Sequence, residues 1–492
     1  MRPVLAIPPF PGARPPAFAL PGGDGLGDAD TLLAALARHR VGGCYWGQAI
    51  AGPAVLTAAN WPADADPWTL LDKAELVVLP AEDPRTLLAL AAGVPLELAG
   101  GEAVDRSALV RAHLTGWAWR DPFSGDAISA VQAIELAGFW RRLIDSNRGI
   151  TAALGFAYWK RPTVAPLLWN GLEAPFQRGM PVLADGDRLA VWRSRLSAAQ
   201  VRALGNRPVL EVEDGFLRSA GLGADCVPPL SISVDGDGVH FDPTRPSGIE
   251  RLLQDGVFPA DLVERAAALR QAIVAAGLSK YERGTVAALP RPGGVRRHVL
   301  VPGQVEDDRA VTSGGALSSN LELLRRARAE AGPDAFLIYK PHPDVLAGHR
   351  KGLIAPADMA TLADQVETAA SMAALIAMVD ELHVNSSLAG FEALLRGKPV
   401  TVHGVPFYAG WGLTTDRGPV PARRTARRTL DELVAAAYLL YPRYLDPETG
   451  LPCPAEVLVR RLTTAPSPLA GIAATVVALR RATGRVRRAL GG

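Results

Sequence analysis

"DELHVNSSLAGFEALLRGKPVTVHG", residues 380–404, is the stretch of sequence that decides the fold. It begins with an apolar, β-rich run that predicts a strand ending at Asn385, and Ser386 and Ser387 then precede a helical run over residues 389–395. Short apolar runs alternate in this way with Ala- and Leu-rich stretches along nearly the whole chain. That alternation is typical of parallel α/β layers, so the sequence predicts an α/β protein.

Four predicted strands end in a loop at their carboxyl end, which is where open α/β sheets bind ligands. They cover residues 208–215, 298–303, 335–343 and 380–387. The Pro- and Gly-rich stretch "ALPRPGGVRR" (288–297) is predicted to link two α/β lobes.

The stretch 380–404 has a counterpart near the beginning of the chain. Three blocks recur in the same order: residues 74–81 with 380–387, 86–100 with 390–404, and 121–125 with 446–450. Two copies at such a distance along the chain indicate a duplicated module.

The early copy lacks the polar residues of the later copy. The replacements are Asn385, Ser386 and Ser387 by Leu79, Pro80 and Ala81, Glu392 by Leu88, and Lys398 by Val94. The apolar frame is retained. Residues 1–147 are therefore interpreted as a degenerate half-module, which keeps the apolar residues needed for packing and has lost the polar residues needed for binding or catalysis.

The composition is that of a globular protein and gives no case for nucleic-acid binding. The 492 residues are 48% hydrophobic and 21% charged, with a net charge of +2. Cys44, Cys226 and Cys453 lie far apart and lack the spacing of metal ligands, which favours a reducing compartment. Neither a signal peptide nor a stretch long enough to cross a bilayer is recognised. We expect a cytosolic protein.

The last residues, 466–492, form a predicted basic tail with five arginines between residues 480 and 488. A basic amphipathic helix can lie on anionic lipid, which would hold the protein peripherally on the inner face of the inner membrane. A solvated helix end explains the same residues equally well.

The two serines before the predicted helix suggest an anion site. Free N–H groups and the positive end of the helix dipole attract phosphate, and the hydroxyls of Ser386 and Ser387 would add donors. Glu392, within the helix, could accept hydrogen bonds from a ribose. The alternative is a plain serine N-cap followed by a solvated glutamate.

"IYKPHPD" (338–344) places a cation and an imidazole after the next predicted strand. Pro341 and Pro343 restrict the backbone around them. Lys340 and His342 on such a stiffened loop suit a phosphate-ester ligand, in the same sheet as the two serines.

"VPGQVEDDRAVTSG" (301–314) carries three consecutive acids, Glu306, Asp307 and Asp308, which nothing in the local pattern assigns to a helix cap. One carboxylate could attack an anomeric carbon, and a neighbour could orient groups or deprotonate an acceptor. Clustered acids also bind divalent cations. A solvated turn is the third alternative.

"EVEDGFLRSAGLGADCVPPLSISVD" (211–235) belongs to the other predicted lobe. Glu213 and Asp214 follow a strand, and Arg218 can form a fork with a carboxylate. The set suits an acidic sugar or a polyanionic acceptor, and an internal Asp–Arg pair accounts for the same residues.

Taken together, these stretches resemble the capsule polysaccharide biosynthesis family of the KpsC/LipB type, over roughly residues 148–462. The motifs that carry the resemblance are "EDGFLRSAGLG", "PPLSISVD", "LSKY", "VPGQVEDD", "SNLELLR", "YKPHPDVLAGHRKG", "SSLAGFEALLRGKPV" and "PFYAGWGLT". Family members are retaining β-Kdo transferases that build an oligo-Kdo linker on lysophosphatidylglycerol. The resemblance implies a GT-B-like fold, in which two Rossmann-type lobes (residues 148–292 on the acceptor side and 293–465 on the nucleotide-sugar side) hold the donor CMP-Kdo between them.

Carried over residue by residue, the resemblance places the nucleophile at Asp308, which would hold Kdo covalently before the acceptor takes it. Glu306 and Asp307 are the candidates for the general base. The donor is expected at Gln304, Lys340, His342, Ser386, Ser387 and Glu392. The acceptor is expected at Glu213, Asp214 and Arg218. CMP-Kdo is a substrate, and neither a cofactor nor a metal ion is implied.

One departure from the family pattern limits the expected activity. Typical members carry two complete transferase modules, whereas no equivalent of "QVEDD" or "KPHP" precedes residue 148. The chain should therefore form one linkage on a lipid-linked Kdo acceptor and rely on a second Kdo transferase, alongside the capsule export machinery. Two alternatives are a GT-B transferase for another nucleotide sugar and a non-catalytic scaffold that binds CMP or glycolipid.

Overall fold

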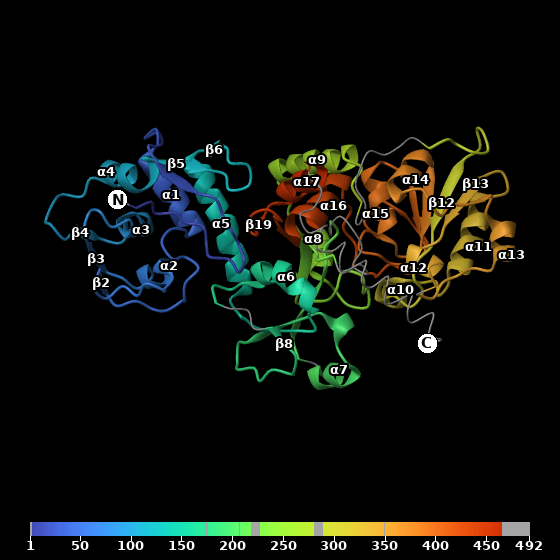
Figure 1. Cartoon of the computed structure of the whole chain (residues 1–492), viewed down its shortest axis with the longest axis horizontal. Coiled ribbons are helices and arrows are strands. Elements are labelled where there is room, and N and C mark those ends of the chain that lie inside the picture. The colour runs from blue at the N-terminus through green and yellow to red at the C-terminus, as the bar shows by residue number, and fades with distance from the viewer. Residues whose placement is uncertain are drawn as a thin grey trace, which may run out of the picture. The chain divides into compact units, whose positions relative to one another are not determined.

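The structure is a computed structural model that describes residues 2–172, 176–205, 207–217, 227–279, 289–348 and 350–464. The chain forms two compact units (Figure 1): the first comprises Met1–Leu189 and Leu445–Cys453, and the second Ala190–Tyr444 and Pro454–Gly492. Arg218 and the predicted basic tail, 466–492, lie outside the described residues. The sequence-based bounds of the lobes stay a prediction.

The first unit is built around two small sheets. One is parallel, in the order β2-β3-β4, and the other is antiparallel, in the order β1-β5-β6. Its strands and helices are β1 (Ala19–Pro21), α1 (Ala29–His39), β2 (Val55–Thr57), α2 (Pro67–Leu71), β3 (Leu76–Leu79), α3 (Arg85–Ala92), β4 (Leu96–Leu98), α4 (Arg106–Val110), a π-helix (Arg111–Thr115), β5 (Trp117–Arg120), β6 (Ala127–Ile128), α5 (Ala130–Asn147), β7 (Ile150–Leu154), α6 (Arg161–Leu168), β8 (Phe176–Gln177) and, in the returning segment, β19 (Pro452–Cys453). Leu36, Leu87 and Trp140 are fully buried in its core, as the apolar spacing of these helices dictates.

The second unit contains the larger of the two purely parallel sheets, called the larger sheet below, and the segments around it. Its elements are α7 (Ala198–Leu204), β10 (Val209–Asp214), β11 (Ser231–Asp235), α8 (Gly248–Asp255), α9 (Ala260–Ala275), β12 (His298–Pro302), α10 (Arg309–Gly314), α11 (Asn320–Ala331), β13 (Phe336–Lys340), α12 (Pro343–Leu346), α13 (Pro356–Leu362), β14 (Gln365–Val366), α14 (Met372–Met378), β15 (Glu381–Val384), α15 (Leu388–Leu395), β16 (Val400–Val402), β17 (Thr415–Asp416), α16 (Leu430–Val434), a π-helix (Ala435–Leu440) and α17 (Ala455–Thr464). Two strands lie at the division between the units, β9 (Arg188–Val191) and β18 (Pro442–Leu445).

Six parallel strands form this larger sheet, in the order β14-β13-β12-β15-β16-β17. Counted along the chain from β12, that is the order 3-2-1-4-5-6 of a doubly wound sheet, whose ligands bind where the order reverses, here between β12 and β15. Figure 1 shows α14 and α15 on one side of the sheet and α11 and α13 on the other. Because both faces are covered, β12 and β13 are buried along their whole length.

The four strands predicted from the sequence are present as β10, β12, β13 and β15. The expectation of parallel layers does not hold for the pair β10 and β11, which is antiparallel, nor for the pair β11 and β18. An antiparallel neighbour needs no helical crossover, so the apolar runs alone did not distinguish the two directions.

The two copies of the sequence repeat share an order of elements as well as residues. In each, a strand, a helix and a second, parallel strand follow one another, β3-α3-β4 in the early copy and β15-α15-β16 in the later one. The aligned Gly93 and Gly397 end these helices with φ of 72° and 71°, a left-handed conformation that glycine adopts readily. Both copies continue through a π-helix and a strand into the turns 121–125 and 446–450.

Within the second unit, a buried contact that we call the Glu250 seam joins α8 to the segment before α16. The Glu250 carboxylate accepts hydrogen bonds from Arg423 and, at 2.8 Å, from Nε of Arg424. Nearby, the rings of Phe216 and Phe407 stack with centroids 4.5 Å apart. Charged and aromatic contacts therefore hold the two parts of this unit together.

Among the described residues, no helix combines the length and the apolar character that crossing a membrane would require.

Candidate active site

Three loops with polar residues leave neighbouring strands at one edge of the larger sheet. Strands β13, β12 and β15 are adjacent and parallel, so the loops after residues 340, 302 and 384 emerge at the same edge. The prediction that the Lys-His and Ser-Ser motifs share a sheet is therefore confirmed.

Gln304 and Ser386 connect the loop after β12 to the loop after β15. The amide oxygen of Gln304 accepts from the backbone N–H of Ser386 at 2.9 Å, and its amide nitrogen donates to the hydroxyl oxygen at 3.2 Å. The hydroxyl in turn donates to the carbonyl of Ala310 at 2.8 Å. These bonds fix the spacing of the two loops across the switch point.

Asn320, which the sequence analysis did not single out, holds the acidic loop in place. Its side chain accepts from the N–H of Gln304 at 2.8 Å and donates to the carbonyls of Gln304 and Gly352 at 2.7 and 2.8 Å. A Cβ at Gly352 would lie 2.6 Å from the Asn320 amide nitrogen, so a side chain there would displace it. The only signal in the sequence was its place in the "SNLELLR" motif.

The three consecutive acids take three separate partners. Glu306, half-buried, accepts from the N–H of Asn320 at 2.8 Å. Asp307 is exposed and pairs with Arg350 at 3.1 Å; partial desolvation opposes the change, but this partner lowers the pKa of the carboxyl. Among the described residues, these three carboxylates do not belong to a group with metal-ligand spacing.

Asp308 is the N-cap of α10: its Oδ1 accepts from the N–H of Ala310 at 2.9 Å. The expectation that no acid here caps a helix is therefore wrong. The helix was missed because α10 has only six residues, which are too few to show a helical apolar pattern. The side chain is exposed, and its Oδ2 accepts no hydrogen bond from the residues that the structure describes. One oxygen of this exposed carboxylate is thus not used by the N-cap.

His342 and Lys340 lie at the end of β13. The Nδ1 of His342 accepts from the N–H of Asp344 at 3.2 Å, so the neutral ring carries its proton on Nε2. Burial lowers the pKa of His342, although the charges of Asp344 and Asp308 act on it in the opposite direction. Lys340 is buried and donates to the carbonyl of Ala370 at 2.7 Å.

Ser387 and Glu392 belong to α15. Ser387 is its N-cap and accepts from the N–H of Ala389 at 3.2 Å, which is the plain cap of the alternative interpretation. The solvated glutamate of that interpretation is wrong, because Glu392 is 6% exposed. Its charge adds to burial in raising the pKa values of Tyr408 and Tyr438.

Near the residues predicted for the acceptor, Arg309 connects the acidic loop to β10. It donates to Glu213 at 2.8 Å and to Glu211, two residues earlier in the strand, at 3.2 Å. Asp214 follows at the end of β10 and is half-buried. The sequence analysis missed Arg309 and Glu211, although the alternation in "EVED" places Glu211 and Glu213 on one face of the strand.

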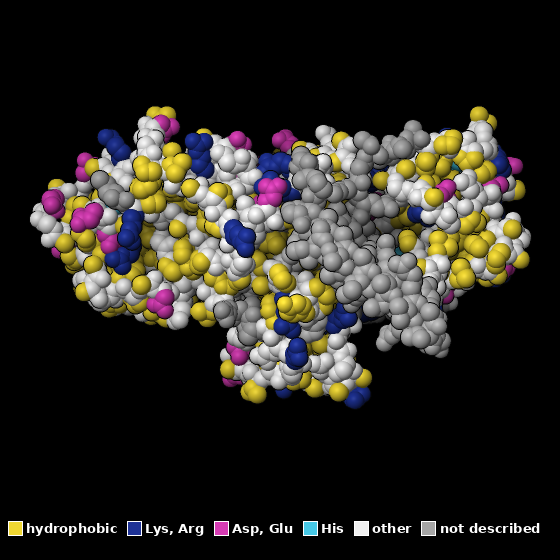
Figure 2. All heavy atoms as spheres, viewed as in Figure 1, with side chains coloured by type: hydrophobic (Ala, Val, Ile, Leu, Met, Phe, Trp, Pro, Cys, Tyr) yellow, Lys and Arg dark blue, Asp and Glu magenta, His cyan; other side chains and the backbone are white. Residues whose placement is uncertain are grey.

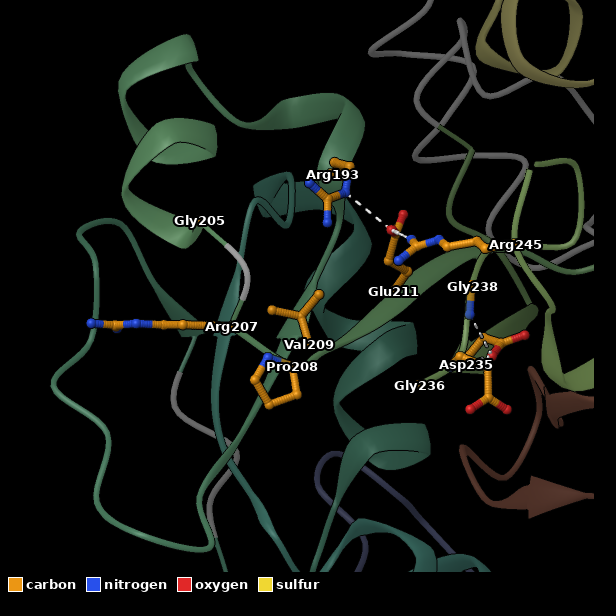
Figure 3. A pocket seen from close by; sticks show the side chains of 11 residues that line it. Arg193, Gly205, Arg207, Pro208, Val209, Glu211, Asp235, Gly236, Gly238 and Arg245 are labelled. Atoms are coloured by element: carbon orange, nitrogen blue, oxygen red, sulfur yellow. Dashed lines mark hydrogen bonds and ion pairs between the residues drawn. The ribbon is translucent and has the colours of Figure 1, made fainter. Parts of the chain in front are cut away.

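A cavity of about 260 Å³ lies beside Glu211 (Figure 3). Arg193 and Arg245 converge on the Glu211 carboxylate from two sides, whereas Arg207 points away. The lining residues are Arg193, Gly205, Arg207, Pro208, Val209, Glu211, Asp235, Gly236, Asp237, Gly238 and Arg245.

Within the described residues, one group of side chains has the geometry for a metal ion, namely Glu330, His383 and His403, whose ligand atoms lie within 4.8 Å of one another. The Nδ1 of His383 and the Nε2 of His403 are 3.2 Å apart, the distance of a hydrogen bond. Neither histidine belongs to the three loops that follow β12, β13 and β15.

The His383–His403 pair predicts a loss of stability in mild acid. Burial and the neighbouring His383 lower the pKa of His403 to about 4. A histidine in the unfolded chain has a pKa of about 6.5. Between pH 6.5 and pH 4, His403 is therefore protonated in the unfolded chain but neutral in the folded protein. As a result, the free energy of unfolding should fall by about 2 kcal/mol from pH 7.5 to pH 5. Urea unfolding at these two pH values should show this fall in the wild type and a smaller one in His403→Gln. Equal pH dependence in both proteins would contradict the prediction.

A family model described as "Capsule polysaccharide biosynthesis protein" matches residues 182–444, more than half of the chain. The chain belongs to the capsule polysaccharide biosynthesis family. All the candidate residues named above for the sheet edge and for β10 lie within the matched segment.

Two curated relatives show how far the family likeness extends. "Capsule polysaccharide modification protein LipA" of Neisseria meningitidis serogroup B is 37% identical over 362 residues, which cover 71% of this chain and 51% of LipA. "Lipopolysaccharide-processing protein LpsZ" of Rhizobium meliloti is 51% identical over 241 residues, 48% of this chain and 54% of LpsZ. The chain thus spans about half the length of the curated relatives it matches.

Solved family structures are similar in fold. The β-Kdo 2,4 transferase of Thermosulfurimonas dismutans KpsC shares 32% identity, with a TM-score of 0.55 over 64% of this chain and 98% of that one. The β-Kdo 2,7 transferase of the same protein also shares 32% identity, with a TM-score of 0.50 over 63% and 98%.

Proposed function

We propose that this chain is a retaining β-Kdo transferase that moves Kdo from CMP-Kdo to a (lyso)phosphatidylglycerol or oligo-Kdo glycolipid in capsule linker synthesis. Support comes from the two KpsC transferases of similar fold and 32% identity. The observation that carries the proposal is the position of Asp308, an exposed carboxylate at the switch point of a parallel sheet, within electrostatic reach of His342.

In the first step, Oδ2 of Asp308 attacks the anomeric carbon of the bound donor. The bond from that carbon to the phosphate oxygen breaks, and CMP leaves with both electrons. CMP is a good leaving group and needs no strong acid. The Nε2–H of His342 and the ammonium of Lys340 are suited to hold its phosphate, because both are donors beside that edge of the sheet.

In the second step, an acceptor hydroxyl gives up its proton and attacks the same carbon from the opposite face. The bond to Asp308 breaks and the carboxylate is released, so two inversions give net retention. Of the two candidate bases, Glu306 is better suited than Asp307, whose pKa is lowered by the partner Arg350. Glu306 keeps one oxygen for the proton while the other accepts from Asn320.

We further propose that the two lobes around this site form a GT-B transferase without a cofactor or metal ion. The doubly wound order of the larger sheet suits a nucleotide-binding lobe, and Arg309 joins it to β10 of the acceptor side. The other linkage would then come from a second Kdo transferase, because the early copy lacks the polar residues of the site.

Product analysis tests the proposed function. The protein is incubated with CMP-Kdo generated in situ and a synthetic mono-Kdo glycolipid, and a product with one added Kdo is expected. CMP binding with no turnover on any glycolipid would indicate a non-catalytic scaffold. Turnover with a different nucleotide sugar alone would identify another GT-B transferase.

Replacement of Lys340 by Met is expected to weaken CMP binding about 10-fold, since a hydrogen bond from a charged group contributes about 1.5–3 kcal/mol. Isothermal titration with CMP measures the effect, and Lys73→Met, an exposed lysine of the first unit, serves as the control. Unchanged affinity in a folded Lys340→Met protein would remove Lys340 from the donor site.

A further inference from the structure

Three arginines surround one buried carboxylate beside the cavity, and Figure 3 shows two of them, Arg193 and Arg245. Glu211 is 3% exposed and accepts from Arg193 at 3.1 Å, from Arg245 at 2.6 Å and from Arg309 at 3.2 Å. We call Arg193, Arg245 and Arg309 the arginine triad. They come from three separate segments, after β9, before α8 and at the start of α10.

The arginine triad carries more positive charge than its protein partners balance. Its acidic partners among the described residues are Glu211 and Glu213, so two carboxylates face three guanidiniums. A guanidinium has five N–H donors. Towards these carboxylates Arg193 and Arg245 each donate one hydrogen bond and Arg309 donates two. The arrangement is therefore prepared for one more anion, which such planar donors bind in pairs of hydrogen bonds.

The wall of the cavity beside the arginine triad contains both acidic and basic side chains. Asp235 accepts from the backbone N–H groups of Gly238 and Gly248, and Asp237 pairs with Arg251 through one oxygen. A wall that holds both carboxylate oxygens and N–H groups can accept hydrogen bonds from sugar hydroxyls and donate hydrogen bonds to them. The guanidiniums can bind the carboxylate of a sugar acid. The volume of about 260 Å³ is below the range of about 300–1,000 Å³ for drug-sized ligands, which suits a single sugar unit.

The third triad member ties this cavity to the candidate nucleophile. Arg309 directly follows Asp308 in the chain, and its guanidinium lies over the ring of Phe241 at 5.1 Å. The ring of Phe241 and the two glutamates hold the Arg309 side chain in place. An anion bound to the triad would therefore be separated from the N-cap of α10 by no more than the length of this side chain. Figure 2 shows Lys and Arg side chains around α7, the helix that ends just before the cavity-lining Gly205.

We propose that the arginine triad binds the carboxylate of a sugar acid at the end of the acceptor, with its hydroxyls directed into the cavity. This inference rests on the proposed function, and it assigns the acceptor specificity to arginines that the sequence analysis did not single out. An acceptor without that carboxylate would leave the triad with its excess charge, so the site discriminates against neutral sugars.

The test begins with binding, because binding does not require turnover. The methyl β-glycoside of Kdo and its primary amide are titrated calorimetrically into the wild type, Arg193→Gln, Arg245→Gln and the control Arg202→Gln, which removes an exposed charge on α7 outside the cavity. The free acid is expected to bind the two triad variants about 10- to 100-fold more weakly than the wild type and the control. The amide should bind all four proteins equally weakly.

A second measurement separates this inference from the proposed function. If the wild type forms the Kdo adduct, both triad variants should form it at the wild-type rate and show a raised KM for the glycoside acceptor. Equal binding of the free acid by all four folded proteins overturns the triad assignment, whether or not an adduct forms. Loss of affinity for glycerol phosphate instead of the glycoside would assign the triad to a lipid phosphate and overturn the carboxylate.

Discussion

Replacement of Asp308 by Asn is expected to abolish the covalent Kdo adduct and to lower the transfer rate by at least about 10³-fold, because the amide cannot act as the nucleophile. Asparagine caps a helix as well as aspartate does, so α10 keeps its N-cap and the fold is expected to persist. Asp308→Ala would lose the cap as well, at a cost of about 1 kcal/mol, which makes it the less informative variant.

Intact-mass measurement after incubation with CMP-Kdo checks this result. The wild type should gain the mass of one Kdo residue, and Asp308→Asn should gain none. The matched control is Asp307→Asn, which removes the neighbouring charge and its pair with Arg350 but keeps the nucleophile. An adduct in Asp308→Asn, or CMP release from the wild type with no adduct at any time, would refute the covalent route.

Replacement of Arg424 by Ala is expected to lower the free energy of unfolding of the second unit by about 3–5 kcal/mol, since it breaks a buried ion pair. The Arg424 side chain is 2% exposed and its partner Glu250 is 5% exposed. Its guanidinium also donates to the carbonyls of Pro406 and Ala409 at 2.8 and 2.9 Å, which would lose their donor. Arg423 keeps its two hydrogen bonds to Glu250, from Nε and, at 3.4 Å, from Nη2, so the charge of Glu250 is not left entirely unpaired.

Urea unfolding followed by tryptophan fluorescence measures this loss. Arg417→Ala is the control, because its ion pair with Glu330 is half-exposed and pairs of that kind contribute about 0–1 kcal/mol. The double variant Glu250→Gln with Arg424→Met should recover part of the loss, since it leaves no unpaired buried charge. If Arg424→Ala unfolds at the same urea concentration as Arg417→Ala, the Glu250 seam does not stabilise the unit.

The strands of the larger sheet were predictable because their signal is local. β12, β13 and β15 are short apolar runs that each end in polar residues, and both properties are visible within ten residues of chain. The cap at Asp308 escaped prediction for the opposite reason, since α10 is too short to show a helical period. The antiparallel direction of β11 depends on a pairing across the sheet, which composition does not encode.

Site residues that lie close together in the sequence could be predicted. Contacts between residues that are far apart in the sequence and are brought together only by the fold were missed. Gln304 and Ser386 were found in separate motifs, but the hydrogen bonds between them join residues 82 positions apart. Glu211 takes its arginines from positions 18, 34 and 98 residues away, and no local pattern connects them. The neighbours of Glu392 on its helix gave no hint that this residue is buried or that its charge acts on Tyr408 and Tyr438.

The Glu250 seam has a consequence for how this protein can be divided. If the chain were cut in the stretch 288–297, the half that holds α8 would expose an unpaired carboxylate together with the ring of Phe216. The other half would expose Arg424 and Phe407, so neither piece would be expected to stay in solution by itself. The two parts of the second unit that the Glu250 seam joins are therefore expected to be exchangeable between proteins only together, and a hybrid protein has to inherit both from one parent.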